Sequence, residues 1–162
     1  MGKNDVLQYL NIIKDEVQDL SLKVWGNPEI SEKEKESADL FRNVLKVHGF
    51  EIKEITGMEH AFIAEYGSGS PVIAVLGEYD ALPGLSQTVD TKFNPVENNG
   101  PGHGCGHNLL GGAALGAVLA IKKYIEETKM SGTIRFYGCP EEETLAGKVK
   151  MIKKGAFERT FQ

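Results

Sequence analysis

The sequence predicts a layered α/β domain. Two observations carry this prediction. Apolar residues recur at helical spacing up to Gly49, and beyond it they occur in the alternating or short continuous runs typical of strands. The expected order is two helices, three strands, a helix, a strand and a helix, which indicates a layered α/β domain.

The first helix is expected over residues 6–24. Its apolar side chains, from Val6 to Val24, recur every three or four positions, as they do on one face of a helix. Gly26 and Pro28 follow closely and end the helix, because neither residue continues helical backbone well.

A second helix is expected to begin at a capping box and to end at Gly49. Ser31 would be its N-cap, and Glu34, three residues on, would complete the box. The charge run Glu32–Glu36 is typical of a solvated first turn, because acidic side chains suit the positive end of a helix.

Three strands are expected next, over residues 50–55, 61–66 and 71–76. The first alternates apolar and polar side chains, as a half-buried strand does. The third is a short, continuously apolar run, which predicts a strand buried on both faces.

The rest of the chain begins with a long loop over residues 84–104, rich in Gly, Asn and Pro. Loops of that length in compact domains usually have a functional role. A helix over 109–128 carries small residues on its first half, which permit close packing against the sheet. A strand over 133–138 and a helix over 146–154 complete the expected elements.

Length and composition suit one globular domain. The chain has 162 residues and a net charge of −5, with no cluster of basic residues, so nucleic acid is not an expected partner. Two isolated cysteines do not form a disulfide framework. The N-terminus carries no signal-peptide pattern, and the apolar run from Leu109 to Ile121 is too short to span a bilayer. We therefore expect a cytoplasmic protein without a membrane segment.

The glycine-rich segment Gly100–Asn108 places His103, Cys105 and His107 within five residues. Thiolate and imidazole are preferred ligands of transition metals, above all zinc. The alternative is a flexible loop holding an ordinary buried cysteine and two solvent-facing histidines. Two ligands do not by themselves make a metal site.

Two further segments supply carboxylates after predicted strands. Glu78 and Asp80 follow the strand over 71–76, and Glu141–Glu143 follow the strand over 133–138. Ligands bind beyond the carboxyl ends of strands in open α/β sheets, so these loops are expected to converge with the glycine-rich segment. Together they form a ligand set for zinc or manganese with open coordination positions, and a spare carboxylate could accept a proton from water.

Two nucleotide-binding motifs are incomplete in this chain. The segment Gly106–Ala113 has Walker-A glycine spacing but lacks the Lys and Ser/Thr that bind phosphate and magnesium, and the dinucleotide fingerprint fails as well. A cysteine hydrolase built on Cys105 and His107 stays open. So does a redox pair of Cys105 and Cys139.

Four segments, in this order, carry a resemblance to a known family. They are Trp25–Ser31 (WGNPEIS), Asp80–Pro83 (DALP), His103–Asn108 (HGCGHN) and Pro140–Glu143 (PEEE). The chain resembles the metallo-aminoacylase/carboxypeptidase family of zinc peptidases, in particular its amidohydrolase branch of p-aminobenzoyl-glutamate hydrolase-like members. The resemblance implies the N-terminal part of a three-layer, phosphorylase/hydrolase-like catalytic domain with a mixed sheet between helices.

The resemblance also implies roles for individual residues. Cys105, His107 and Glu143 match metal ligands, with Cys105 bridging two ions, and Glu142 matches the general base. Asp80 matches a catalytic-site acid that orients a ligand histidine, although Glu78 stands in that histidine's place. The implied cofactor is one or two zinc or manganese ions.

The implied activity is metal-dependent hydrolysis of an amide bond in N-acyl amino acids, dipeptides or aminobenzoyl-glutamate-like compounds. Relatives in the family are far longer, and the resemblance leaves a homodimer open for them. We therefore expect residues 1–162 to be one partial catalytic domain, without a lid domain or further metal-ligating histidines, and with impaired activity. The alternative is a non-catalytic truncated remnant or the metal-binding half of a split protein.

Overall fold

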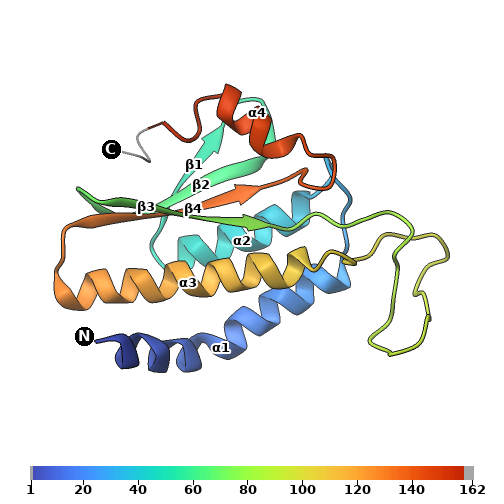
Figure 1. Ribbon diagram of the computed structural model, residues 1–162, viewed down its shortest axis with the longest axis horizontal. Helices are drawn as coiled ribbons and strands as arrows, with labels where there is room; N and C mark the ends of the chain where they lie inside the picture. Colours follow the sequence, from blue (N-terminus) through green and yellow to red (C-terminus); the bar gives the residue numbers. More distant parts are fainter. Residues whose placement is uncertain (1, 159–162) are drawn as a thin grey trace.

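The computed structural model describes residues 2–158, so Met1 and the last four residues of the expected 1–162 domain lie outside the described part. Its elements follow the predicted order (Figure 1). They are α1 (Lys3–Gly26), α2 (Lys35–Val47), β1 (Glu51–Ile55), β2 (Met58–Ser68), β3 (Val72–Glu78), α3 (His107–Thr128), β4 (Gly132–Cys139) and α4 (Gly147–Lys153).

The four strands form one mixed sheet in the order β1-β2-β4-β3. β2 runs antiparallel to both β1 and β4, whereas β3 and β4 are parallel, with Glu78 opposite Cys139. The expectation of a mixed sheet is confirmed. Because β3 and β4 are parallel neighbours, their carboxyl ends finish at the same edge of the sheet.

The prediction that residues 71–76 are buried on both faces is wrong. β3 lies at the edge of the four-stranded sheet, and Ile73 and Leu76 are 50% and 37% exposed. The central strand is β4, which is buried along most of its length. A continuous apolar run indicates a strand with some burial on each face, but it does not determine the strand's position in the sheet.

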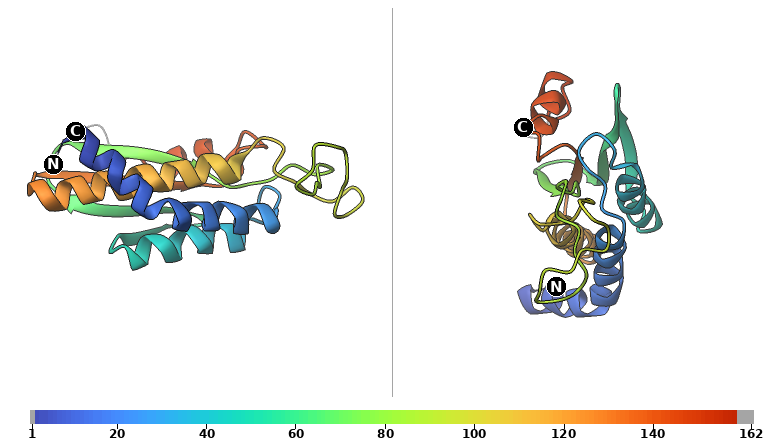
Figure 2. Two further views of the ribbon diagram at one scale, coloured as in Figure 1. Left: turned by 90° about the horizontal axis from the view of Figure 1, so that it is seen from below. Right: turned by 90° about the vertical axis from the view of Figure 1, so that its right-hand side faces the viewer.

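Helices cover both faces of the sheet, giving three layers (Figures 1 and 2). On one face, Phe62, Ile134 and Phe136 pack in a cluster with apolar residues of α1, α2 and α3. On the other face, Tyr137 and Cys139 pack with Met151 of α4. The alternation along β4 follows from the period of two in a strand.

Helix α3 is a core element of this fold. It is 22 residues long and contains an 18-residue window with a mean hydropathy of 1.2, so by length and composition it could cross a membrane. In the structure it packs between α1 and the strands β3 and β4, which accounts for its apolar composition.

The predicted capping box at Ser31 and Glu34 is wrong. Helix α2 begins at Lys35, and the backbone amides of Glu36 and Ser37 donate to the Glu29 carboxylate at 3.1 and 2.7 Å. Ser31 instead donates its hydroxyl to Asp80 at 2.8 Å. Ser31 therefore bonds to Asp80, which is distant in sequence, and does not cap the first turn of α2. Sequence spacing does not reveal such a partner.

Close approach of α3 to the end of β3 depends on Gly111. A Cβ atom there would lie 2.5 Å from the backbone oxygen of Glu78 and 2.7 Å from the Phe41 ring. At Gly116, five positions further along the helix, the nearest atom would lie 3.7 Å away, an ordinary contact. The two glycines therefore have different roles in one helix.

We expect Gly111→Ala to lower the free energy of unfolding by about 1–3 kcal/mol, because overpacking outweighs the better helix propensity of alanine. The matched Gly116→Ala variant should raise it by up to about 1 kcal/mol. Urea denaturation measures both changes. Equal changes in the free energy of unfolding for the two substitutions would contradict the close approach of Gly111 to Glu78 and Phe41.

Candidate metal centre

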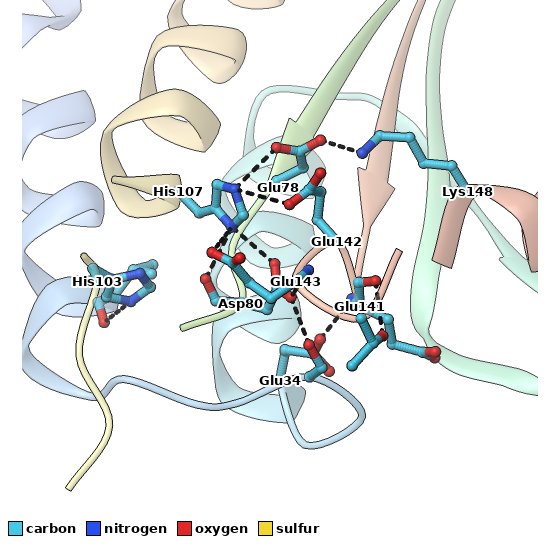
Figure 3. A network of polar contacts seen from close by, with 12 residues as sticks. Glu34, Glu78, Asp80, His103, His107, Glu141, Glu142, Glu143 and Lys148 are labelled. Carbon is cyan, nitrogen blue, oxygen red and sulfur yellow. Dashed lines mark hydrogen bonds and ion pairs between the residues drawn. The ribbon is translucent and has the colours of Figure 1, made fainter. Parts of the chain in front are cut away.

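Three segments converge beyond the carboxyl ends of β3 and β4 (Figure 3). Glu78 ends β3 and Asp80 follows it, Glu141–Glu143 follow β4, and His107 opens α3. Gly106, at a left-handed φ of 81°, makes the turn that starts α3. The predicted convergence is observed, with one difference: the glycine-rich segment follows the long loop that succeeds β3 and does not follow a strand directly.

His107 is the hub of the cluster and is buried. Its Nδ1 lies 2.9 Å from Asp80 Oδ1 and 3.0 Å from the Asp80 backbone oxygen. Since both partners are acceptors, Nδ1 carries the proton and donates it. Its Nε2 points to the opposite side, 3.3 Å from Glu78 Oε2 and 3.6 Å from Glu142 Oε2. In the neutral ring, Nε2 therefore offers a lone pair to a cation.

Carboxylates control the charge of this imidazole. Burial by itself would lower the pKa of His107, but the hydrogen bond to Asp80 and the charges of Asp80 and Glu78 outweigh it and raise the pKa. The ring thus carries a proton more readily than a free histidine when no metal is bound. A metal ion would displace the proton on Nε2.

Asp80 is held behind His107 and is buried. It accepts hydrogen bonds from His107 Nδ1, from the backbone N–H of Glu143 at 2.9 Å and from Ser31 Oγ at 2.8 Å. Burial would raise the pKa of Asp80, but these three donors outweigh it and lower the pKa. The carboxylate is therefore ionised and orients the imidazole, the arrangement common behind metal-ligating histidines.

Two groups of three side chains could each hold an ion. One comprises Cys105, His107 and Glu143, and the other Glu78, His107 and Glu142, with the ligand atoms of each group within 4.8 Å of one another. Oε1 of Glu143 is buried and has no hydrogen-bond partner within residues 2–158. A buried carboxylate oxygen that accepts no hydrogen bond, beside a thiol and an imidazole, fits a divalent cation.

Cys105 is exposed at this centre, and its thiol is not activated. Partial desolvation raises the pKa of this thiol, as do the neighbouring Glu143, Glu142 and Glu78 carboxylates. Activated cysteine nucleophiles have lowered pKa values next to positive charge, which is the reverse of this environment. The cysteine-hydrolase alternative therefore finds no support in the geometry.

Two other residues of the sequence prediction lie outside the cluster. His103 is buried, with Nε2 3.1 Å from the Val24 backbone oxygen and its ring stacked on Trp25. Cys139 is buried among apolar residues, and burial raises its pKa to about 12. Both cysteines are free thiols. A redox pair would also have free thiols in its reduced state, so this observation does not decide the redox-pair alternative.

The structure adds residues that sequence reasoning missed. Lys148 of α4 bonds to Glu78 Oε1. Burial would lower the pKa of Lys148, but this hydrogen bond and the charge of Glu78 outweigh it and raise the pKa. Glu34, expected in a solvated turn, is fully buried and accepts a 2.7 Å hydrogen bond from the backbone N–H of Glu141. Glu78 was named with Asp80 as a carboxylate after the predicted strand, although no role as a ligand was assigned to it. Glu34 and Lys148 carried no signal in the sequence.

The chain matches a family of known peptidases along its C-terminal half. The model of peptidase family M20/M25/M40 matches residues 74–162. The chain belongs to this family. It is 46% identical over 145 residues to one subunit of the p-aminobenzoyl-glutamate hydrolase of Escherichia coli, covering 86% of this chain and 30% of that protein.

Two other members extend the likeness. Thermostable carboxypeptidase 2 of Saccharolobus solfataricus is 31% identical, covering 94% of this chain and 38% of that protein. A dinuclear metal-binding peptidase of Bacillus subtilis superposes with a TM-score of 0.79 at 27% identity, covering 91% of this chain and 41% of that one. The chain thus spans about a third of the length of the curated relatives it matches.

Glu34 makes stability depend on pH. Burial raises its pKa to about 7, assisted by the charges of Asp80 and Glu141 and opposed by backbone hydrogen bonds. A carboxyl whose folded pKa lies above the unfolded value stabilises most below the unfolded pKa, and this contribution is lost as the pH rises to about 7. The loss amounts to about 3 kcal/mol.

We expect Glu34→Gln to remove this loss. The stability of the variant relative to the parent chain should increase by about 3 kcal/mol between pH 4.5 and pH 8, because the amide does not ionise. Urea denaturation across this range measures the difference. A difference that stays constant with pH would contradict the assigned burial effect.

Proposed function

We propose that this chain forms the metal-binding, water-activating part of a metal-dependent amidohydrolase. The observation that carries the proposal is the buried His107, whose Nδ1 is bound by Asp80 while Nε2 points toward Glu78 and Glu142. Membership of the peptidase family supports it, as do relatives named as hydrolase, carboxypeptidase and dinuclear metal-binding peptidase.

Cys105, His107 and Glu143 are proposed as metal ligands, and Glu78 completes a second group with His107. Thiolate with imidazole favours zinc, while the carboxylates also suit manganese. An ion held there would polarise the amide carbonyl of a substrate and acidify a water molecule. The donor set can serve one ion, or two ions that share part of it.

Glu142 is proposed as the general base. Its side chain is 30% exposed, compared with 15% for Glu143 and 14% for Glu78, so it is the most accessible carboxylate of the three. Its Oε2 lies on the Nε2 side of His107, where a water molecule can reach it. There it can take the proton from water and transfer it to the leaving nitrogen.

Asp80 is proposed to act through His107. It fixes the ring orientation and the Nδ1–H tautomer, and its hydrogen bond from the Glu143 amide holds that residue beside the ring. Its full burial keeps it away from substrate, so its contribution is to hold ligands in place.

The proposed substrates are N-acyl amino acids, dipeptides and aminobenzoyl-glutamate-like compounds, following the names of the relatives. Residues 1–162 are proposed to be one part of a larger catalytic unit, since the chain spans 30% of the Escherichia coli relative. That relative is named a subunit, which supports a role of this chain within a complex. The alternative, that this chain is a non-catalytic remnant or the metal-binding half of a split protein, stays open.

Metal binding can be tested with cobalt as a spectroscopic probe. We expect Co²⁺ to give a thiolate charge-transfer band and to bind with one or two ions per chain. Cys105→Ser should abolish the band and weaken affinity about 10-fold or more, because the soft ligand is lost. The matched Cys139→Ser variant should keep both. A band that depends on Cys139 would overturn the ligand assignment.

Hydrolysis is tested separately on a panel of N-acetyl amino acids, dipeptides and p-aminobenzoyl-glutamate, with added zinc or manganese. We expect slow turnover by the 162-residue chain. In Glu142→Gln turnover should fall about 100-fold or more while metal affinity is retained. Metal binding without any turnover would favour the non-catalytic alternative. Failure to bind metal would sink the proposal.

A further inference from the structure

The turn that carries Glu142 and Glu143 has an unfavourable backbone conformation at its first residue. Glu141 has a φ of 58°, in the left-handed region that non-glycine residues seldom adopt. Such a conformation persists only where the surroundings determine it strongly, and it is concentrated at functional sites. Glu141 is also the residue whose direction sets where the next two side chains point.

Contacts at Glu141 hold the turn from several sides. Its backbone oxygen accepts hydrogen bonds from Thr144 Oγ1 at 3.1 Å and from the Gly147 N–H at 3.3 Å. Its side-chain carboxylate bonds to Lys150. All three partners belong to the same stretch of chain as the turn itself.

The backbone N–H of Glu141 has a partner of a different kind. It donates to Oε1 of Glu34 at 2.7 Å, across 107 positions of sequence (Figure 3). Glu34 lies just before α2, is fully buried and uses only this oxygen, since Oε2 has no hydrogen-bond partner in the described part of the chain. A buried carboxyl group is costly, so its single strong contact is the feature that accounts for its place.

We propose that Glu34 is a positioning residue that holds the turn at Glu141 and thereby directs Glu142 and Glu143 toward His107. It acts together with Ser31, which lies three residues earlier and bonds to Asp80. The segment before α2 thus supports the cluster from behind, although it supplies no ligand. The consequence for metal affinity rests on the proposed function.

Two substitutions separate the reach of the Glu34 side chain from its acidity. Glu34→Gln keeps the length and an acceptor oxygen for the Glu141 amide. Glu34→Asp keeps the carboxyl group but is one methylene shorter and leaves the amide without its partner. Ser37→Ala is the matched control, because Ser37 is buried in the first turn of α2 and bonds to Glu29, away from the turn.

The first measurement is amide hydrogen exchange at Glu141 and Glu143 in the metal-free chain, followed by NMR. We expect Glu34→Asp to speed exchange at Glu141 about 10-fold or more, because the protecting acceptor is withdrawn. Glu34→Gln and Ser37→Ala should stay within about threefold of the parent chain at this amide.

The second measurement is Zn²⁺ affinity by competition with a chelating dye. Loss of a hydrogen bond that orients ligands should weaken binding about 10- to 100-fold in Glu34→Asp, with Glu34→Gln and Ser37→Ala close to the parent chain. If Glu34→Asp does not fold, Glu34→Met, which has similar length and no acceptor, takes its place.

Two results would overturn the inference. One is unchanged exchange at Glu141 in a folded Glu34→Asp or Glu34→Met chain. The other is a loss of zinc affinity in Glu34→Gln as large as that in Glu34→Asp, which would show that the reach of the acceptor oxygen does not decide the effect. If the parent chain binds no zinc, the proposed function fails, while the exchange measurement still decides the role of Glu34.

Discussion

The buried Asp80 carboxylate is the constraint on which the rest of the cluster depends. An ionised group without solvent is tolerated only when donors surround it. Its donors come from the segment before α2, from the turn after β4 and from the start of α3. One side chain at the end of β3 therefore ties three separate segments together, and the parallel pairing of β3 with β4 brings them within reach.

Excess negative charge is the second property of this region. Glu78, Glu142 and Glu143 all approach His107, and Lys148 is the fixed cation bonded to the group. Like charges at this separation raise one another's free energy unless a cation joins them. Despite burial, the hydrogen bond to Asp80 and the charges of Asp80 and Glu78 raise the pKa of His107, while desolvation and the charges of Glu143, Glu142 and Glu78 raise that of Cys105. A cation at the proposed site would offset this negative charge.

Much of the fold could be predicted because its signals are local. Periodicity gave the order of helices and strands, and the breaks at Gly26 and Gly49 lie where α1 and α2 end or just beyond. The position of β3 at a sheet edge was not predictable, because strand order depends on long-range pairing.

Some residues of the cluster were likewise marked by local sequence patterns, whereas others reach it only through contacts distant in sequence. Residue type and spacing indicated Cys105, His107 and the run Glu141–Glu143, and the family resemblance singled out Glu142 and Glu143 within that run. The structure brings Cys105 and His107 together with these two carboxylates. Ser31 was assigned to a cap because its local pattern fits one, whereas the hydroxyl bonds to Asp80, 49 positions away. Glu34 and Lys148 contact the cluster only through tertiary packing, so no local pattern marks them. The roles of the site residues stay predictions.

The environment of Cys105 also bears on chemical durability. Oxidants react with thiolates far faster than with thiols, so a neighbourhood that raises the thiol pKa slows oxidation. A lower thiolate fraction would therefore slow the reaction of the exposed sulfur with peroxide. The negative charges that would attract a cation to the proposed site would, in the absence of that cation, also make Cys105 less easily oxidised.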